Sequence, residues 1–171
     1  MKFNSINIEM LEEIKLDQTD LLILAQLQQD ASISNQALAT KVFTSPPTCL
    51  RRVKRLKDMG VIERQIVVLS VDKIAPPLGH GLNAIVEITL DRQDTRSLET
   101  FEARAVQEAA VQHCYRVSPG PDFVLVVFSR DMPGFLALSE RLFTQDANVR
   151  NVKTFFSLKR AKFDPSISVL F

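Results

Sequence analysis

The stretch SISNQALATKVFTSPPTCLRRVKRLKDMGVI, residues 32–62, decides the fold of the first part of this chain. Its pattern predicts two short helices joined by a tight connection. Ser34 stands at the N-cap position of the first helix, and Ala37, Leu38 and Val42 give that helix one apolar face. Two short helices joined in this way form the layout of a helix-turn-helix.

The second helix of this pair is expected to begin at Ser45. Its hydroxyl is placed to accept from N–H groups of the first turn, and Pro46 suits the first helical position, where its missing N–H costs nothing. Successive side chains lie about 100° apart around a helix, which places four of them on one side. We expect that side to face a core, and its residues are Cys49, Leu50, Val53 and Leu56. The opposite side and its flanks hold Pro47, Thr48, Arg51, Arg52, Lys54 and Arg55.

Positive charge is concentrated on this second helix. Residues 44–65 hold six basic side chains against two acidic ones, whereas residues 1–43 hold three basic against six acidic. A basic helix face is often no more than a solvated surface. A local basic patch on a chain whose net charge is only +1 is nevertheless compatible with nucleic-acid binding.

The composition is that of a packed globular protein. A length of 171 residues with 46% hydrophobic content accommodates one large domain or two small ones. Residues 1–15 lack the basic start and apolar stretch of a secretory signal, and no later run is long and apolar enough to span a membrane. We therefore expect a cytoplasmic protein.

Catalytic or metal chemistry has little support in the sequence. Cys49 and Cys114 are far apart and lie among apolar neighbours, which predicts buried free thiols. The histidines, His80 and His113, have no recognisable nucleophile or metal partner. An enzyme, a cofactor site and a metal site are therefore not expected.

Four segments follow one another along the chain. A first helix is expected from Asp17 to about Gln29, ahead of the two helices of the helix-turn-helix. Gly60 ends the helix that begins at Ser45. The next stretch, VIERQIVVLSV, is rich in β-branched residues and predicts one or two short strands. A Pro/Gly-rich connection follows. The predicted organisation is an N-terminal extension at 1–15, a helix-turn-helix domain at 16–63, a connecting strand and linker at 64–81, and a second domain at 82–171.

The second domain is predicted to be α+β with the element order βαββαβ. Strands are expected at 82–90, 111–118, 122–129 and 149–163, and helices at 95–110 and from about Asp131. This order matches the ferredoxin-like arrangement, an antiparallel sheet with two helices on one face. The strand at 122–129 is apolar on both faces, so one sheet face is free for association, and we expect at least a dimer.

From Leu16 to Phe163 the chain resembles the Lrp/AsnC family, the leucine-responsive regulators of bacteria and archaea. The resemblance rests on LDQTDLLILAQLQQDASISNQALA (16–39), on SPPTCLRRVKRLKDMGVI (45–62), and on a βαββαβ unit with HCYRVS followed by DF. It implies a winged helix-turn-helix domain that binds double-stranded promoter DNA at roughly palindromic sites. It also implies a second domain that assembles dimers, often into octamers, and senses an amino acid such as leucine or methionine between dimers.

The resemblance also implies site residues. Expected DNA contacts are Ser45, Pro47, Thr48, Arg51, Arg52, Lys54 and Arg55, with Arg51 and Arg55 reaching base edges or phosphates and the other basic side chains mainly phosphates. The expected effector site is the loop that joins the second and third strands, with the last strand beside it. Its residues are Gly120, Pro121, Asp122, Phe123, Thr154 and Ser157.

Two departures from the family pattern bear on function. Phe43 stands where the family often has glycine in the helix-turn-helix connection, so either the turn is built differently or Phe43 packs as an extra core residue, and we favour packing. In the effector loop Pro119 replaces the usual glycine, and the two flanking prolines remove N–H donors, although Asp122 remains to hold an ammonium group. The alternative functions are a ligand-independent architectural DNA-binding protein and, less favoured, a sensing partner of another regulator.

Overall fold

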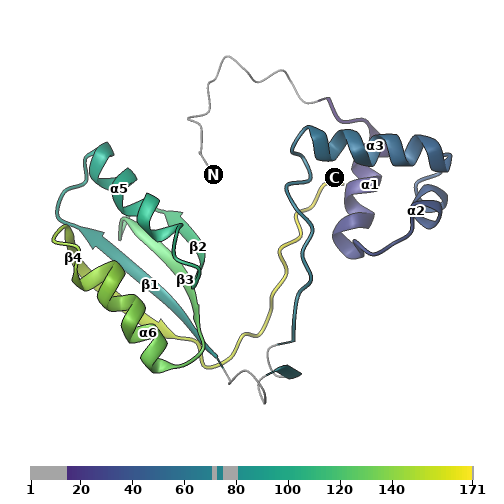
Figure 1. Ribbon diagram of the computed structural model, residues 1–171. Helices are drawn as coiled ribbons and strands as arrows, with labels where there is room; N and C mark the ends of the chain where they lie inside the picture. The colour runs from purple at the N-terminus through teal and green to yellow at the C-terminus, as the bar shows by residue number, and fades with distance from the viewer. Residues whose placement is uncertain (1–14, 71–72, 75–80, 171) are drawn as a thin grey trace. The chain divides into compact units, whose positions relative to one another are not determined.

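The computed structural model describes residues 15–70, 73–74 and 81–170. The chain forms two compact units (Figure 1). One unit contains the described residues up to Val67 together with those from Phe163 onward, and the other runs over Val68–Lys162.

The N-terminal unit contains three helices, α1 (Gln18–Gln29), α2 (Asn35–Lys41) and α3 (Pro46–Asp58). The cap predicted at Ser34 is confirmed, since its side chain accepts from the backbone N–H of Ala37, and Asp17 caps α1 in the same way by accepting from that of Asp20. These bonds satisfy N–H groups that have no acceptor within the helix. The core that joins the helices consists of Ile23, Leu38, Ala39, Val42, Cys49 and Leu56.

Two predictions about apolar side chains of this unit are wrong. Leu50 does not point into the core, because its side chain is 60% exposed, and Phe43 does not pack as a core residue, because it is 91% exposed. The backbone of Phe43 has φ 55°, a left-handed conformation that points its side chain out into solvent.

The short strands expected after Gly60 are also absent from the described residues, because 61–70 carries no regular secondary structure. β-Branched residues favour an extended backbone, but a strand forms only where a neighbouring strand supplies ladder hydrogen bonds. No described segment of this chain pairs with 61–70 in that way.

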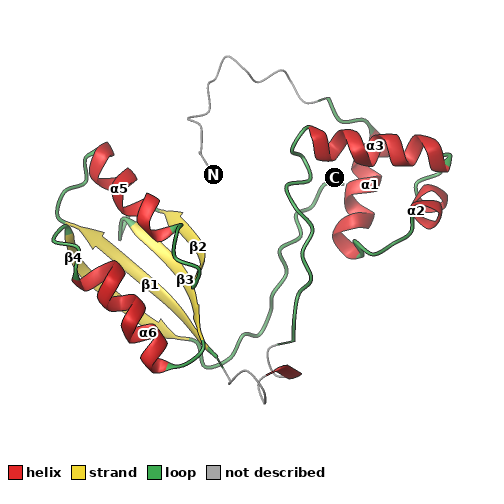
Figure 2. Cartoon of the chain, viewed as in Figure 1, coloured by secondary structure: helices red, strands yellow, loops and turns green. Residues whose placement is uncertain are grey.

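The second unit is a four-stranded antiparallel sheet with the strand order β2-β3-β1-β4. Its strands are β1 (Leu82–Leu90), β2 (Val111–Arg116), β3 (Phe123–Ser129) and β4 (Val149–Phe156). Helices α5 (Thr95–Ala105) and α6 (Met132–Ser139) lie on the same face of the sheet, and α6 continues as the π-helix η2 (Glu140–Thr144) (Figure 2). The predicted ferredoxin-like arrangement is confirmed.

The core lies between this sheet and its helices. Alternate residues of β1 and β3 point into it, as the burial of Val86, Ile88, Leu125 and Val127 shows. Phe101 of α5 packs against the same cluster. The other face of the sheet carries the residues that lie between these positions, and no described helix covers it (Figure 2).

Three elements end earlier than predicted, and the first is β2, which ends at Arg116 instead of residue 118. β4 ends at Phe156 instead of residue 163, because its pairing partner β1 has its first paired residue at Ala84, opposite Phe156. α5 ends at Ala105 instead of residue 110. The chain then turns, and the N–H of Val111 donates to the carbonyl oxygen of Glu108 as β2 begins.

Candidate nucleic-acid interface and effector loop

Helix α3 turns one side into the core of its unit and another into solvent. Cys49 and Leu56 are buried, whereas Pro47, Arg51 and Lys54 are exposed. The three exposed residues follow one another at helical spacings of four and three, so they form one stripe along the outer side of the helix. The stripe carries two positive charges, and no carboxylate pairs with Arg51 or Lys54 within the described part of the chain.

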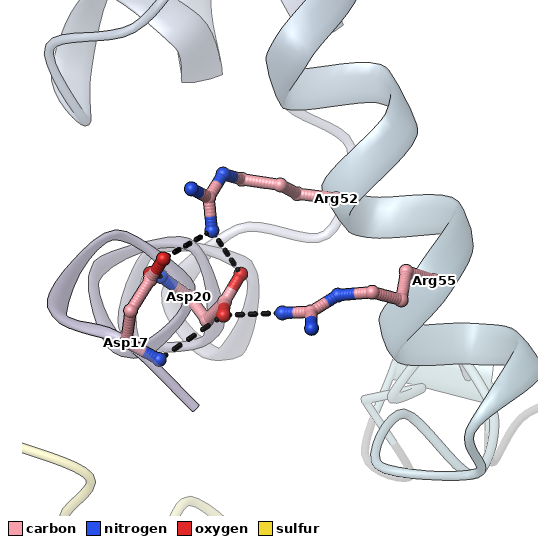
Figure 3. Close-up of polar contacts among 4 residues, drawn as sticks. All are labelled: Asp17, Asp20, Arg52 and Arg55. Carbon is pink, nitrogen blue, oxygen red and sulfur yellow. Dashed lines mark hydrogen bonds and ion pairs between the residues drawn. The ribbon is translucent and has the colours of Figure 1, made fainter. Parts of the chain in front are cut away.

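The other two arginines of α3 are bound to α1. Arg52 Nη1 donates to Asp17 Oδ2 at 2.7 Å and to Asp20 Oδ1 at 2.9 Å, and Arg55 Nη2 donates to Asp20 Oδ2 at 2.5 Å (Figure 3). The side chain of Asp20 is fully buried. These four residues, the Asp17–Asp20–Arg52–Arg55 cluster, join the first turn of α1 to the middle of α3.

The contacts of this cluster shift the pKa values of Asp17 and Arg52. The backbone N–H of Asp20, followed by the guanidinium of Arg52, holds the pKa of Asp17 below its ordinary value. The carboxylates of Asp17 and Asp20 in turn raise the pKa of Arg52. A buried carboxylate needs such partners, because desolvation without them is costly.

The start of α3 is built differently from the expected cap. Ser45 is the N-cap residue, but its hydroxyl accepts no hydrogen bond from the first turn. It donates instead to Thr48 Oγ1 at 2.8 Å. The next two residues, Pro46 and Pro47, have no N–H to offer. The hydroxyls of Ser45 and Thr48 are therefore paired with each other at the N-terminal end of the helix.

The seven residues predicted to contact DNA therefore fall into two sets. Five lie at the start or along the outer side of α3: Ser45, Pro47, Thr48, Arg51 and Lys54. The other two, Arg52 and Arg55, reach toward α1. The burial of Asp20 was not predicted, although an acid three residues after the N-cap residue Asp17 is the sequence signature of a capping box.

The loop between β2 and β3 is held at both ends. The N–H of Val117 donates to the carbonyl oxygen of Asp122 at 3.1 Å, and the N–H of Asp122 donates to that of Ile88 at 2.8 Å. Asp122 Oδ2 accepts from the N–H of Leu90 at 2.7 Å and from Gln93 Nε2 at 3.3 Å. One carboxylate oxygen of Asp122 is thus already used to fix the end of β1.

The remaining predicted effector residues are not gathered at this loop within one chain. Phe123 is fully buried and packs against Phe101 with ring centroids 4.9 Å apart, so its side chain has no surface for a ligand. Thr154 pairs with Val86, further along the sheet than Ile88, where the loop is bonded. The N–H of Ser157 donates to Asn83, at the opposite end of the sheet from Asp122. Gly120 and Pro121 remain in the loop beside Asp122.

An open depression of about 700 Å³ lies at the same end of the sheet as this loop. It is lined by the connection from β1 to α5 and by the turn before β4, and it contains charges of both signs, among them Asp91, Arg92, Arg96 and Asp146. Within the described ranges, no group of three His, Cys, Asp or Glu side chains is placed to hold a metal ion. In the same described ranges, no helix has the length and apolarity needed to cross a membrane.

Comparisons with known proteins match both units. A family model for winged helix-turn-helix DNA binding matches residues 16–63, and one for the Lrp/AsnC ligand binding domain matches residues 83–167. An uncharacterised HTH-type transcriptional regulator of Haemophilus influenzae is 36% identical over 89% of this chain and 88% of its own length. The leucine-responsive regulatory protein of Rhizobium meliloti is 33% identical over 90% of this chain and 96% of its own.

Solved structures of transcriptional regulators also superpose on this chain. A transcriptional regulator of Neisseria meningitidis in complex with L-Met superposes with a TM-score of 0.77 at 29% identity, covering 90% of this chain and 96% of its own. An AsnC family transcriptional regulator of Agrobacterium tumefaciens gives a TM-score of 0.78 at 26% identity, covering 89% and 96%. These matched families and relatives are transcriptional regulators and not enzymes.

Proposed function

The chain belongs to the Lrp/AsnC family of transcriptional regulators, with a DNA-binding and a ligand-binding domain, and on that premise we propose that α3 binds specific promoter sites under the control of an amino acid. The DNA-binding role is supported by the charge pairing of the basic side chains on α3. Arg51 and Lys54 stand on the outer side of α3 without a carboxylate partner in the described chain, while Arg52 and Arg55 are held by Asp20. A free positive stripe on a second helix of a helix-turn-helix suits the DNA backbone and base edges.

The two sets of arginines have different roles in this proposal. Arg51 reads a base edge and Lys54 contacts a phosphate, with Ser45, Pro47 and Thr48 at the entering end of the helix. Arg52 and Arg55 chiefly fix the position of α3 on α1, because their charges are already paired. Arg55 is the more exposed of the two, so its outer edge remains available to a phosphate.

The test begins with selection of binding sites from random duplex DNA by the full chain. Affinity is then measured by fluorescence anisotropy on a selected duplex and on its scrambled version, at the same salt. Arg51→Ala should weaken binding to the selected duplex by about tenfold or more, since a bidentate arginine contact contributes about 1–3 kcal/mol of discrimination. On the scrambled duplex the loss should be much smaller.

Two matched variants sharpen this comparison. Lys57→Ala removes a charge whose Nζ donates to Gln65 Oε1 on the same domain, and it should weaken both duplexes alike. Arg150→Ala removes an exposed charge from β4 in the other unit and should change neither. Equal losses on both duplexes for Arg51→Ala would show that Arg51 reads no base.

We further propose that the protein acts as a homodimer that assembles further, to an octamer in the family's pattern. Support comes from the sheet face opposite α5 and α6, which carries exposed apolar residues on β1, β2 and β4, among them Ile85, Tyr115 and Phe155. A dimer presents two α3 helices, so its sites should be roughly palindromic.

The proposed effector is an amino acid bound between dimers at the loop Gly120–Pro121–Asp122. Asp122 Oδ1 accepts no hydrogen bond within the described chain, so it is available to an ammonium group, and the mixed charges of the neighbouring depression suit a zwitterion. Leucine and methionine are the first to test, because the similar Neisseria regulator was solved with L-Met.

Thermal unfolding against the twenty amino acids at millimolar concentration tests the effector. A ligand at 100 times its dissociation constant should stabilise the protein by about 2.7 kcal/mol. Asp122→Asn is the paired variant, and it should lose the shift with any amino acid that gives one. A shift that survives in Asp122→Asn would remove this loop from the site.

A ligand-independent architectural role is the second candidate. It is favoured by the use of Asp122 Oδ2 within the fold and by the prolines on both sides of Gly120. In that case no amino acid shifts the unfolding temperature, and the selected and scrambled duplexes bind alike with the same steep salt dependence.

A further inference from the structure

Two exposed apolar side chains accompany the basic stripe of α3, and the proposed DNA binding leaves them without a role. We propose that Phe43 and Leu50 contact the 5-methyl groups of thymines in the major groove and so contribute to the choice of binding site. This inference rests on the proposed DNA-binding function and adds a class of base contact that the charged residues do not supply.

A short turn connects α2 to α3 (Figure 1). Phe43 belongs to this turn, because it lies between the end of α2 at Lys41 and the start of α3 at Pro46. Its ring is 91% exposed, and its φ of 55° is a left-handed conformation that a bulky side chain rarely adopts. The N–H of Phe43 donates to Thr40 and that of Thr44 to Ala39, which keeps the turn closed. Glycine would adopt this backbone without strain. Because the ring of Phe43 is exposed, packing within this unit does not explain a phenylalanine at this position.

Leu50 is the second exposed apolar side chain of this region. It is 60% exposed and lies next to Arg51 and one turn before Lys54. The inward side of α3 is already occupied at this level by Cys49. Leu50 therefore adds apolar surface beside the two positive charges of the stripe, Arg51 and Lys54.

The position of both residues on the motif selects DNA as the partner. A helix-turn-helix inserts the N-terminal part of its second helix into the major groove. Phe43 lies two residues before the N-cap Ser45, and Leu50 lies in the second turn. In that groove the thymine methyl is the apolar feature that a side chain such as phenylalanine contacts. The adjacent charges of Arg51 and Lys54 favour a polyanion over an apolar protein partner.

The test removes one methyl group at a time from the DNA. Thymidines of a selected duplex are replaced singly by deoxyuridine, and affinity is measured for the full chain and for Phe43→Ala and Leu50→Ala. Burial of one methyl group corresponds to about a fourfold change in affinity, so the wild-type chain should bind some of the uracil duplexes about three- to fivefold more weakly. Each variant should bind the thymine duplex more weakly than the wild-type chain does. At the thymines that the missing side chain contacts, replacement by deoxyuridine should no longer change the affinity of that variant.

Three controls make the outcome decisive. Leu136→Ala removes a side chain of similar exposure from α6 and should leave every duplex unchanged. Phe43→Gly removes the ring and the strained backbone together; it should unfold at no lower temperature than Phe43→Ala and show the same loss of DNA affinity. Light scattering on each variant should give the wild-type subunit number.

Failure of the inference differs from failure of the proposed function. If the wild-type chain does not prefer selected over scrambled DNA, the proposed function itself is wrong. If it does, but uracil has the same effect on the wild-type chain and on both variants, these residues do not read thymine methyls. A changed subunit number with unchanged response to uracil would place them in a protein interface and would also overturn the inference.

Discussion

At the scale of single residues, Asp20 is the most constrained charge in the DNA-binding unit. Its carboxylate is fully buried and bound by Arg52 and Arg55, and its backbone and side chain also form the capping box with Asp17. Loss of one partner from a buried ion cluster leaves the others uncompensated. Asp20→Ala should therefore lower the free energy of unfolding by about 3 kcal/mol, measured by urea unfolding followed by circular dichroism.

Asp58→Ala is the matched control for Asp20→Ala. Asp58 is the exposed acid at the end of α3, and its removal should change the free energy of unfolding by less than about 0.5 kcal/mol. If Asp20→Ala were as mild as this control, the cluster would not hold α3 on α1.

The two cysteine thiols should be slow to react in the folded protein. Burial raises the pKa of Cys49, and burial together with the nearby charge of Glu102 raises the pKa of Cys114 to about 11. The thiolate is the reactive form, so very little of it is present at pH 8. A thiol reagent that absorbs on reaction should label the native protein slowly at both positions and the urea-unfolded protein at once. The predicted burial holds for Cys49, whereas Cys114 is only half-buried. Rapid labelling of the native chain would contradict the burial of Cys49 or the raised pKa of Cys114.

Acid should destabilise the protein through carboxylates that the fold keeps ionised. The hydroxyl and backbone N–H of Ser97 hold the pKa of Asp94 below its ordinary 3.8, and Asp17 is lowered in the same direction. A group with a lowered pKa contributes its full stability above its unfolded value, and the contribution is lost as the pH falls through the lower folded pKa. Urea midpoints should therefore be flat from pH 6 to pH 5 and fall below about pH 4.

Asp94→Asn gives the comparison for this pH effect. Asparagine still caps a helix but does not titrate. The fall below about pH 4 should become shallower in the variant, since one linked proton is removed. An unchanged slope would mean that other carboxylates account for the acid sensitivity.

At the scale of elements, much of the fold could be predicted because local signals agree with the packing. Asp17 and Ser34 begin their helices as the sequence indicates, and alternation of apolar residues gives the inward side of β1. One exception is the rotation of α3. The sequence pattern places Leu50 inside and Arg55 outside, but the buried Asp20 draws Arg52 and Arg55 toward α1 and turns Leu50 outward. Apolar periodicity cannot detect a charge that becomes part of a core.

The predicted effector loop between β2 and β3 was harder to derive from the sequence than the helices were. The family pattern marks the loop before β3, but it does not say which of its side chains the fold itself uses. Phe123 is a core residue, and one oxygen of Asp122 fixes the end of β1. Both roles depend on the sheet register, which pairs Phe123 with Ile88 and cannot be derived from either strand alone.

The N-cap of α2 offers a prediction at the element scale. Ser34 accepts from the N–H of Ala37 at 3.2 Å, and α2 has only seven residues, so few other bonds hold its first turn. Ser34→Ala should lower the free energy of unfolding by about 1 kcal/mol in urea denaturation. Ser34→Asp keeps an acceptor at this position and should stay close to the wild-type value. If both variants were equally destabilised, the loss would not come from the cap.

At the scale of the whole molecule, the proposed dimer rests on the sheet face that no described helix covers. Val126 lies at its centre, between Ile85 on β1 and His113 on β2, and points away from the helices because its neighbours Leu125 and Val127 are buried beneath them. A second copy that covers this face would bury Val126. Val126→Glu should then convert the dimer to a monomer, because an unpaired carboxylate would be desolvated at the interface.

Size-exclusion chromatography with light scattering measures this change, and circular dichroism shows whether the fold persists. Leu136→Glu is the control, since Leu136 is 59% exposed on α6, on the other side of the sheet. It should leave the dimer intact. Because a palindromic site engages two α3 helices at once, the monomeric Val126→Glu chain should also lose most of its affinity for a full site and little for a half-site. A folded Val126→Glu dimer would mean that this face of the sheet is not the one through which two copies associate.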